Sequence, residues 1–345
     1  MLNKNNTFLM VVASIILVAS FLVVPCASKE GPKGWPKSIA WGTASPGGTF
    51  YITTAAMSNV ATKYVGIPFS NTPGGSAANI NGIKEGTIDI AQIFTENTYM
   101  TFTGTGVYVG KQTKNIRHLF RFYNNPWWLQ TVEGSGVATL RDAKGKRFSY
   151  PNPIFPIKEY VGNLLLEANG LTPSDVQVVK TASVGEQNRL LSAGGCDVQL
   201  QNLPPSTPSI QELARRIKLR VVPNTQAEID FLTKRTTLTP YTMKKDSFPG
   251  CDKDTPTLAM YCNEVARAEV PDDLIYAVVR AVFEHLDELK PAHAVFAELT
   301  LKNAIEGAPA PFHAGAIKYY KEKGVWTKKL DAFQRDMLAK IGAKK

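Results

Sequence analysis

A glycine-rich turn near the start of the chain brings together backbone donors, hydroxyl groups and aromatic rings. The sequence WGTASPGGTFY (41–51) places this turn between a short apolar strand, 39–42, and a helix predicted over 49–64. The first N–H groups of a helix lack partners within it and its dipole makes this end positive, so it attracts carboxylates and similar anions. A plain strand–helix turn whose glycines only relieve backbone strain is the alternative. The predicted ligand contacts in this turn are Ser45, Gly48, Thr49 and Phe50.

Similar residues lie where other predicted strands end. Ser76 follows Gly74-Gly75 at a second helix N-terminus, although it could equally be an ordinary N-cap, and Glu96 could equally cap the helix that follows it. Trp127 and Trp128 alternate along one strand, so at most one faces a ligand, and we select Trp128. The remaining predicted contacts are Gly75, Ser76, Phe94, Thr95, Glu96, Arg121, Trp128, Asn152, Gln201 and Asn202.

Arg121 differs from the other candidates because it carries a fixed charge. A guanidinium group holds a carboxylate through two parallel hydrogen bonds, which suits an organic acid as ligand. A salt bridge on the hinge side of the molecule is the alternative for this residue.

These residues are positioned by strands that alternate with helices along most of the chain, which predicts an α/β fold with mainly parallel sheets. Two runs of such units, with a turn–helix–glycine–strand pattern at 75–89 and again at 185–197, indicate two similar lobes. Extended segments at 118–130 and 257–266 are predicted to cross between them, and a helix is predicted over 271–289. Ligands of open α/β sheets bind at the carboxyl ends of the strands, so the site is expected in the cleft between the lobes.

The N-terminus predicts export. An apolar run over 8–24 follows Lys4 and ends before Lys29-Glu30, as in a secretory signal peptide cleaved near Cys26–Ser28. A retained anchor or a lipid on Cys26 is the alternative. In an oxidising compartment Cys251 and Cys262 could form a disulfide, whereas Cys196 is expected to be a buried thiol.

Charge and motifs exclude several functions. The formal net charge is +10, but the basic residues are scattered and form no nucleic-acid-binding signature. Nucleophile-elbow, zinc-protease and dinucleotide-binding motifs are missing from the sequence, and Gly104–Lys111 only superficially matches a phosphate-binding loop. Neither a cofactor nor a metal is expected, and nothing in the chain requires oligomerisation, so a monomer is expected.

Four segments resemble the solute receptors of tripartite ATP-independent periplasmic (TRAP) transporters, of the TAXI subfamily. They are GTASPGGTFY (42–51), TPGGSAANINGIKEGTIDIA (72–91), the segment 248–289 and PFHAGAIKYYKEKG (311–324). The resemblance implies a periplasmic binding protein fold of type II, with a ligand cleft between its lobes. It also implies a receptor without enzymatic activity that passes a small organic anion to a TRAP-type permease. The implied organisation is a signal peptide over 1–28, a first lobe over 36–122, a second lobe over 123–256, and a return crossing with C-terminal helices over 257–345.

Three segments depart from this family pattern. They are FTE at 94–96, the proline-rich SYPNPIFP at 149–156, and the aromatic crossing RFYNNPWW at 121–128. Proline removes backbone donors and the aromatic side chains add apolar surface. We therefore hypothesise a larger or more apolar carboxylate than glutamate. A ligand sensor for a membrane kinase, or less readily an exported enzyme, is the alternative function.

Overall fold

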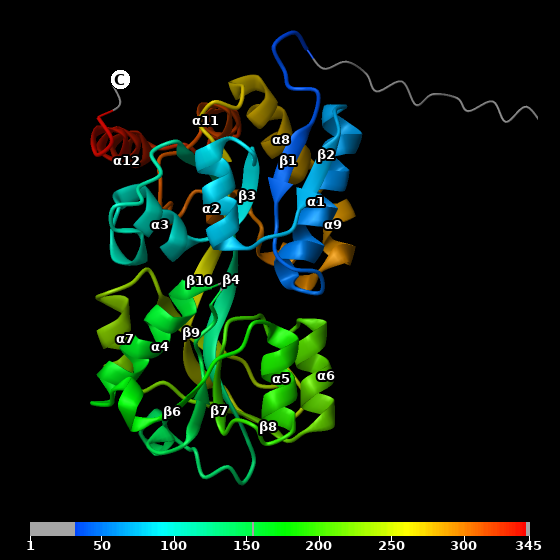
Figure 1. The fold of residues 1–345 in the computed structure, drawn as a ribbon. Helices are drawn as coiled ribbons and strands as arrows, with labels where there is room; N and C mark the ends of the chain where they lie inside the picture. Colours follow the sequence, from blue (N-terminus) through cyan, green and yellow to red (C-terminus); the bar gives the residue numbers. More distant parts are fainter. Residues whose placement is uncertain (1–31, 154, 343–345) are drawn as a thin grey trace, which may run out of the picture.

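The computed structural model describes residues 32–153 and 155–342, so the predicted signal peptide lies outside the described residues. Two α/β lobes are stacked end to end (Figure 1), which confirms the predicted fold class. Their strands form one hydrogen-bonded path in the order β2-β1-β3-β10-β4-β7-β5-β6, with β8 paired to β4 and β9 paired to β10. None of the helices in the described residues has the length and apolarity needed to cross a bilayer.

The first lobe is built on a mixed sheet. Strands β1 (Ile39–Gly42), β2 (Phe69–Thr72) and β3 (Ile90–Phe94) run parallel, and β10 (Thr255–Arg267) lies antiparallel between β3 and the first part of β4 (Ile116–Val132). Each parallel strand is followed by a helix, so the helix N-termini gather beyond the carboxyl edge of the sheet. These helices are α1 (Thr49–Val65), α2 (Ser76–Glu85) and α3 (Thr95–Thr103), with a short 3-10 turn, η1 (Gly106–Tyr108), after α3.

The second lobe repeats the scheme. Strands β5 (Arg147–Ser149), β6 (Gln177–Val179) and β7 (Val198–Gln201) are parallel, and the second part of β4 lies antiparallel between β7 and β8 (Leu219–Val222). Strand β9 (Thr239–Met243) pairs with the start of β10. The helices are α4 (Pro156–Ala168), α5 (Val184–Ser192), α6 (Pro208–Arg216) and α7 (Gln226–Thr233), with 3-10 turns η2 (Leu140–Ala143) and η3 (Pro173–Asp175).

Strands β4 and β10 cross between the lobes, as the sequence predicts. Within β4, residues up to Trp127 pair with β10, whereas residues from Trp128 onward pair with β7 and β8. Because the second-lobe strand β9 pairs with Thr255–Ala259 of β10, the passage between the lobes extends over several residues of each crossing strand. Both crossing strands are almost continuously buried, which agrees with their apolar sequences.

Buried polar contacts confirm that the two lobes echo each other. In the first lobe the Asn79 side chain donates to the carbonyls of Thr43 and Gln92, 3.2 and 3.0 Å away. In the second lobe the Gln187 side chain donates to the carbonyls of Ser149 and Leu200, 3.0 and 3.1 Å away. Each contact ties a helix to the ends of two strands of the sheet. The same structural device therefore occurs once in each lobe.

The C-terminal segment packs on the first lobe. The predicted helix over 271–289 is interrupted at His285, giving α8 (Asp272–Glu284) and α9 (Leu286–Leu289). His313 accepts from the Gly315 amide through Nδ1, as expected of a residue that caps a helix, and Tyr320 donates to the Leu119 carbonyl at 2.8 Å. The remaining elements are η4 (Lys290–Ala292), η5 (Ala294–Glu298), α10 (Leu301–Ala304), α11 (Ala314–Glu322) and α12 (Lys328–Ala339).

The cysteine prediction is wrong in one respect. Cys251 and Cys262 are free and buried, and they lie in different lobes. Cys262 sits on β10 opposite Phe94, whereas the Cys251 thiol donates to the Lys244 carbonyl at 3.2 Å. Most of the short segment between the two cysteines belongs to the crossing strand β10, which carries Cys262 away from Cys251, so the thiols cannot meet. Cys196 is a buried thiol, as expected.

Candidate functional site

The boundary between the lobes gathers helix N-termini that lack side-chain caps. Helices α1, α2 and α3 of the first lobe begin there after Gly48, Gly75 and Phe94, and none of the three has a side-chain cap hydrogen bond. Helices α4 and α6 of the second lobe begin there after Phe155 and Thr207, also uncapped. Helix α5, which also begins at the carboxyl edge of the second-lobe sheet, is capped by Ser183, and α7, α10 and α12 carry threonine caps. Backbone donors and positive dipole ends are therefore concentrated at this boundary.

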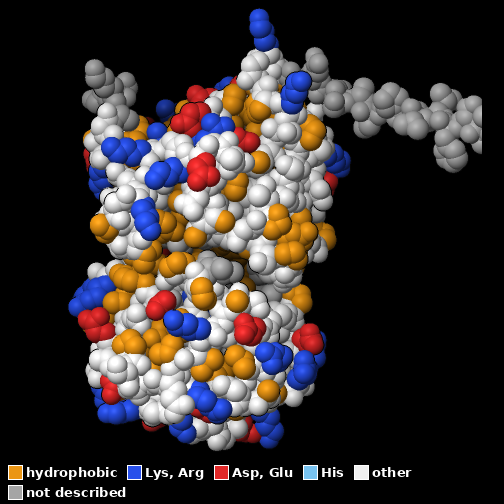
Figure 2. All heavy atoms as spheres, viewed as in Figure 1, with side chains coloured by type: hydrophobic (Ala, Val, Ile, Leu, Met, Phe, Trp, Pro, Cys, Tyr) orange, Lys and Arg blue, Asp and Glu red, His pale blue; other side chains and the backbone are white. Residues whose placement is uncertain are grey.

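An aromatic cluster occupies the centre of the boundary. The Phe94 ring lies 4.7 Å from Phe50, 5.3 Å from Phe155 and 6.2 Å from Trp127, measured between centroids. Phe155 belongs to the second lobe and also contacts Trp127, with centroids 6.0 Å apart. The Trp127 side chain is buried and its indole N–H has no hydrogen-bond partner among the described residues. Figure 2 shows a transverse groove between the lobes with hydrophobic side chains on its rims.

Two polar contacts join the lobes beside this cluster. The hydroxyls of Thr49, in the first turn of α1, and Thr207, the residue before α6, lie 3.1 Å apart. On the other side, the Glu96 carboxylate accepts from the backbone N–H of Thr237. Burial raises the pKa of Glu96 above its usual range, because the charged carboxylate loses its hydration.

The other predicted residues of the first lobe hold the loops of this boundary. Ser45 is exposed in the turn before α1, and its carbonyl accepts from the Gly48 amide at 3.3 Å. The N-cap of α2 is Gly75 rather than Ser76. Gly75 has a φ of 111°, which a residue with a side chain rarely adopts. The Ser76 hydroxyl accepts from the Phe94 amide at 3.4 Å, and Thr95 donates to the Tyr261 carbonyl at 2.5 Å.

In the second lobe, a lysine that the sequence analysis did not select lies at the carboxyl edge of the sheet. Lys158, in the first turn of α4, is buried, and its ammonium donates to the Gln187 Oε1 at 2.7 Å. Burial lowers the pKa of Lys158 to about 7. Gln187 in turn bonds the end of β5 at Ser149, so the ammonium lies where the strand ends and the helices α4 and α5 begin.

Three predicted residues of the second lobe lie at the same strand ends. The Asn152 carbonyl accepts from the Phe155 amide at 2.9 Å, which shapes the entry to α4. The Gln201 side chain accepts from the Asn202 amide at 2.9 Å through Oε1, while its buried Nε2 has no partner among the described residues. The Asn202 carbonyl accepts from Asn125, at 2.5 Å.

Two predicted ligand contacts are placed away from the boundary. Trp128 is fully buried in the second lobe, where it donates to the Leu203 carbonyl at 3.0 Å and packs on Phe248. The two tryptophans alternate in direction along β4, as expected, but Trp127 is the one that lies at the boundary. Arg121 lies over the Tyr261 ring, 3.3 Å from its centroid, and forms a 3.5 Å ion pair with Glu306 of the C-terminal segment. Arg121 therefore forms a salt bridge on the hinge side of the molecule, which was the alternative to a ligand contact.

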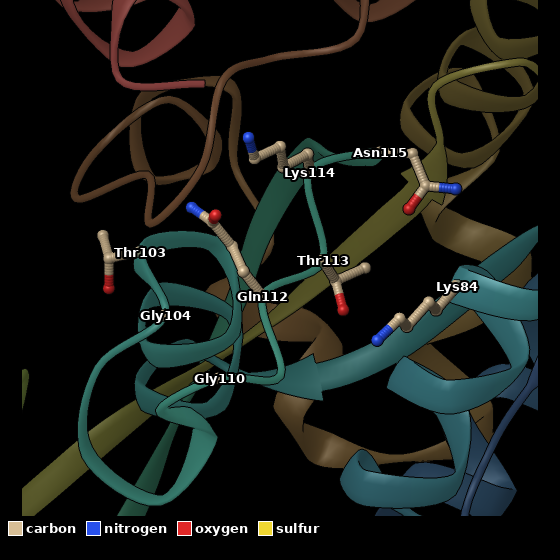
Figure 3. A pocket seen from close by; sticks show the side chains of 8 residues that line it. All are labelled: Lys84, Thr103, Gly104, Gly110, Gln112, Thr113, Lys114 and Asn115. Carbon is tan, nitrogen blue, oxygen red and sulfur yellow. The ribbon is translucent and has the colours of Figure 1, made fainter. Parts of the chain in front are cut away.

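Two surface cavities lie elsewhere. One, of about 620 Å³, is on the first lobe between the C-terminal end of α2 and the loop after α3, with Lys84 and Lys114 at its edge (Figure 3). The segment 104–111 lines part of it but leads to β4 rather than to a helix, so it lacks the helix N-terminus of a phosphate-binding loop. The other is on the second lobe, around the turn at 133–136 and Cys251. In the described part of the chain, no group of three or more His, Cys, Asp or Glu side chains is placed to hold a metal ion.

Sequence reasoning missed Lys158, Thr207 and Trp127 as boundary residues. Lys158 stands two residues after a proline at a predicted helix start, a signal that could have been used. Thr207-Pro208 has the pattern of a helix start as well. The side of β4 on which each tryptophan lies depends on the strands beside it, so no local signal distinguishes Trp127 from Trp128.

Comparisons with known proteins agree with this architecture. Residues 41–324 match the model of the NMT1-like family. The structure of MatC from Rhodopseudomonas palustris with bound malate superposes with a TM-score of 0.54 at 11% identity, covering 87% of this chain and 99% of that one. The periplasmic aliphatic sulphonate binding protein SsuA from Escherichia coli gives a TM-score of 0.44 at 11% identity, covering 87% and 90%. The chain thus belongs to the NMT1-like family, and it shares the fold of MatC.

Proposed function

We propose that the protein is an extracytoplasmic receptor that closes its two lobes around a small organic anion and delivers it to a TRAP-type membrane permease. The observation that carries this proposal is the convergence of uncapped helix N-termini from both lobes on one aromatic-lined boundary. Backbone N–H groups would hold the anionic end of the ligand, and the rings would contact its apolar part.

Binding would operate by lobe closure. Strands β4 and β10 are the covalent connections at the boundary, so a small change in their backbone angles would open the lobes. A ligand that contacts both lobes stabilises the closed state by its difference in affinity for the two states. The Thr49–Thr207 and Glu96–Thr237 contacts would form on closure and be lost on opening.

The surroundings of the boundary favour an aromatic or aliphatic carboxylate. The second-lobe loop contains Pro151, Pro153 and Pro156, which have no N–H to offer, and the Phe50, Phe94, Trp127 and Phe155 rings are apolar. The malate held by MatC is an organic anion as well, which supports this class of ligand without defining its size.

The permease partner and the export of the chain rest on the four TRAP-like sequence segments and on the apolar run over 8–24. Ligand-dependent uptake that requires both this receptor and a TRAP-type permease is expected. Normal uptake in a strain without the receptor would contradict the transport role.

Native mass spectrometry of the protein purified from periplasm is the direct test of ligand class. It is to be followed by thermal-shift measurements with malate, glutamate, phenylacetate, benzoate and hexanoate. A co-purified organic acid, or a melting temperature raised by an acid, is the expected result. A bare protein that no acid stabilises would contradict the proposed function.

A further inference from the structure

The Lys158 ammonium is buried without a counter-charge. It lies in the first turn of α4, where the positive end of the helix dipole adds to its own charge. Gln187 Oε1 is its neutral acceptor, and in residues 32–153 and 155–342 no carboxylate is within ion-pair distance of Lys158. A buried charge is costly unless it is paired, so this arrangement is unfavourable in the protein alone.

Other buried donors near the boundary also lack acceptors. The indole N–H of Trp127 and the Nε2 of Gln201 have no partner among the described residues. Trp127 contacts Phe155, which lies three residues before Lys158 at the start of α4. A buried ammonium whose printed partner is a neutral amide oxygen fits a ligand group that only accepts hydrogen bonds, such as a carboxylate or sulfonate.

The charge at the boundary fits one negative group rather than two. Lys158 is the buried cation on the second-lobe side, whereas Glu96 of the first lobe and the exposed Arg235 lie near Tyr160 of α4. Arg121, the second cation that the sequence suggested, is paired with Glu306 on the hinge side. A second carboxylate on the ligand would meet the Glu96 carboxyl and the aromatic rings, with only the exposed Arg235 as a cation beside them.

We propose that Lys158 is the counter-charge for the ligand, and that the site takes a monoanionic, largely apolar organic acid whose charged end lies at the carboxyl end of β5. This inference rests on the proposed receptor function and extends it to a residue and a ligand charge. An anion beside the ammonium favours its protonated form, so binding above neutral pH takes up a proton.

The ionisable groups on the surrounding elements do not replace Lys158 in this role. Glu159 is exposed, Glu186 is half-buried and accepts from the Ala182 amide at 2.8 Å, and Glu228 bonds Asn169 at the opposite end of α4. Burial raises the pKa values of Tyr108, Tyr150 and Tyr160, which keeps these phenols neutral. Glu96 can titrate, and for this reason the pH profile is compared between the wild type and a Lys158 variant.

The test measures dissociation constants of phenylacetate, benzoate and hexanoate, each beside its primary amide, and of succinate, at pH 6 to 9. The wild type is expected to bind at least one monocarboxylate, and to bind it more tightly than its amide and than succinate. Lys158→Met should weaken that acid by about 100-fold and leave the amide unchanged. Lys218→Met, at an exposed lysine of the same lobe, should change neither by more than about twofold.

The pH profile of the wild type provides a second measurement that does not depend on the variant folding. Its affinity for the acid should fall by up to about tenfold per pH unit above pH 7, and calorimetry in two buffers should show proton uptake. Equal binding of the acid by Lys158→Met, or a flat pH profile, would overturn the role of Lys158 and leave the receptor function standing. Tighter binding of succinate would overturn the monoanion. Failure of every acid to bind the wild type would overturn both.

Discussion

At the residue scale, the buried carboxyl of Glu264 shows how the first lobe holds an ionisable group without a charge partner. It lies on β10 and accepts from the indole N–H of Trp41 at 2.9 Å. Burial raises the pKa of Glu264 to about 8. Because the folded protein binds this proton more tightly than the unfolded chain, its stability falls as the pH rises from about 4.5 towards 8.

Glu264→Gln should remove this loss of stability. An amide keeps the acceptor for Trp41 and carries no charge, so the free energy of unfolding at pH 8 should rise by a few kcal/mol relative to the wild type, at about 1.4 kcal/mol per pKa unit. At pH 5 the two proteins should differ little. Urea unfolding at both pH values measures the difference. An exposed control, Glu306→Gln, should show no such pH dependence, and a constant difference for Glu264→Gln would contradict the argument.

The two adjacent tryptophans should behave in opposite ways. Trp127→Phe removes an unpartnered donor from the boundary and should weaken binding of an organic acid by about threefold to tenfold; because it loses no hydrogen bond, it should cost less stability than Trp128→Phe. Trp128→Phe removes the hydrogen bond to Leu203 in the core and should lower stability by about 1 to 3 kcal/mol, with affinity unchanged. Calorimetry and urea unfolding of both variants separate these effects; the reverse pattern would restore Trp128 as the ligand contact.

At the element scale, a glycine fixes how the C-terminal segment packs on the first lobe. A Cβ on Gly315 would lie 2.1 Å from the Asp272 carbonyl oxygen and 2.8 Å from the Tyr276 amide, both backbone atoms of the segment that begins α8. Helices α8 and α11 can cross this closely only because position 315 has no side chain. The signature at 311–324 is therefore explained by packing and capping instead of ligand binding.

Gly315→Ala should destabilise the protein by at least about 2 kcal/mol, because backbone cannot move aside as a flexible side chain can. Gly185→Ala is the matched control. Gly185 lies in α5, and a Cβ added to it would have no heavy atom within 4 Å. This control should be neutral or stabilising by up to about 1 kcal/mol. Urea unfolding of both variants gives the comparison, and equal stabilities would show that α8 and α11 separate at little cost.

At the scale of the whole molecule, closure depends on a few contacts across the boundary. Thr207 makes no cap hydrogen bond to its own helix, so its hydroxyl serves the contact with Thr49. This leaves the stability of α6 nearly independent of that hydroxyl. Lobe closure can therefore be tested with little disturbance of the second lobe.

A double-mutant cycle with Thr49→Val and Thr207→Val should reveal this closure contact. Each single variant should weaken binding of an organic acid. The double variant should lose less binding free energy than the sum of the two single losses, with a coupling energy of about 0.5 to 1 kcal/mol. Thr225→Val, which breaks a genuine capping box, should cost about 1 kcal/mol of stability without changing affinity. Strict additivity of the two boundary variants would mean that the threonines do not act together in the bound state.

The sequence by itself determined the local elements and their order. The strand at 39–42 has the predicted bounds, and the helix after the first turn differs by one residue, because periodicity and glycine stops are local signals. The two crossings and the repeat of the lobes were predictable for the same reason.

Only the tertiary structure decided which side chains meet at the boundary. Successive side chains of β4 point to opposite faces, and packing turns Trp127 towards Phe94 and Phe155 and Trp128 towards Phe248 in the second-lobe core. Cys251 and Cys262 are kept apart because the segment between them passes from one lobe into the other. Lys158 is buried because Gln187, from another helix, covers it at the end of β5. These outcomes depend on contacts between segments distant in sequence, which local propensity does not encode.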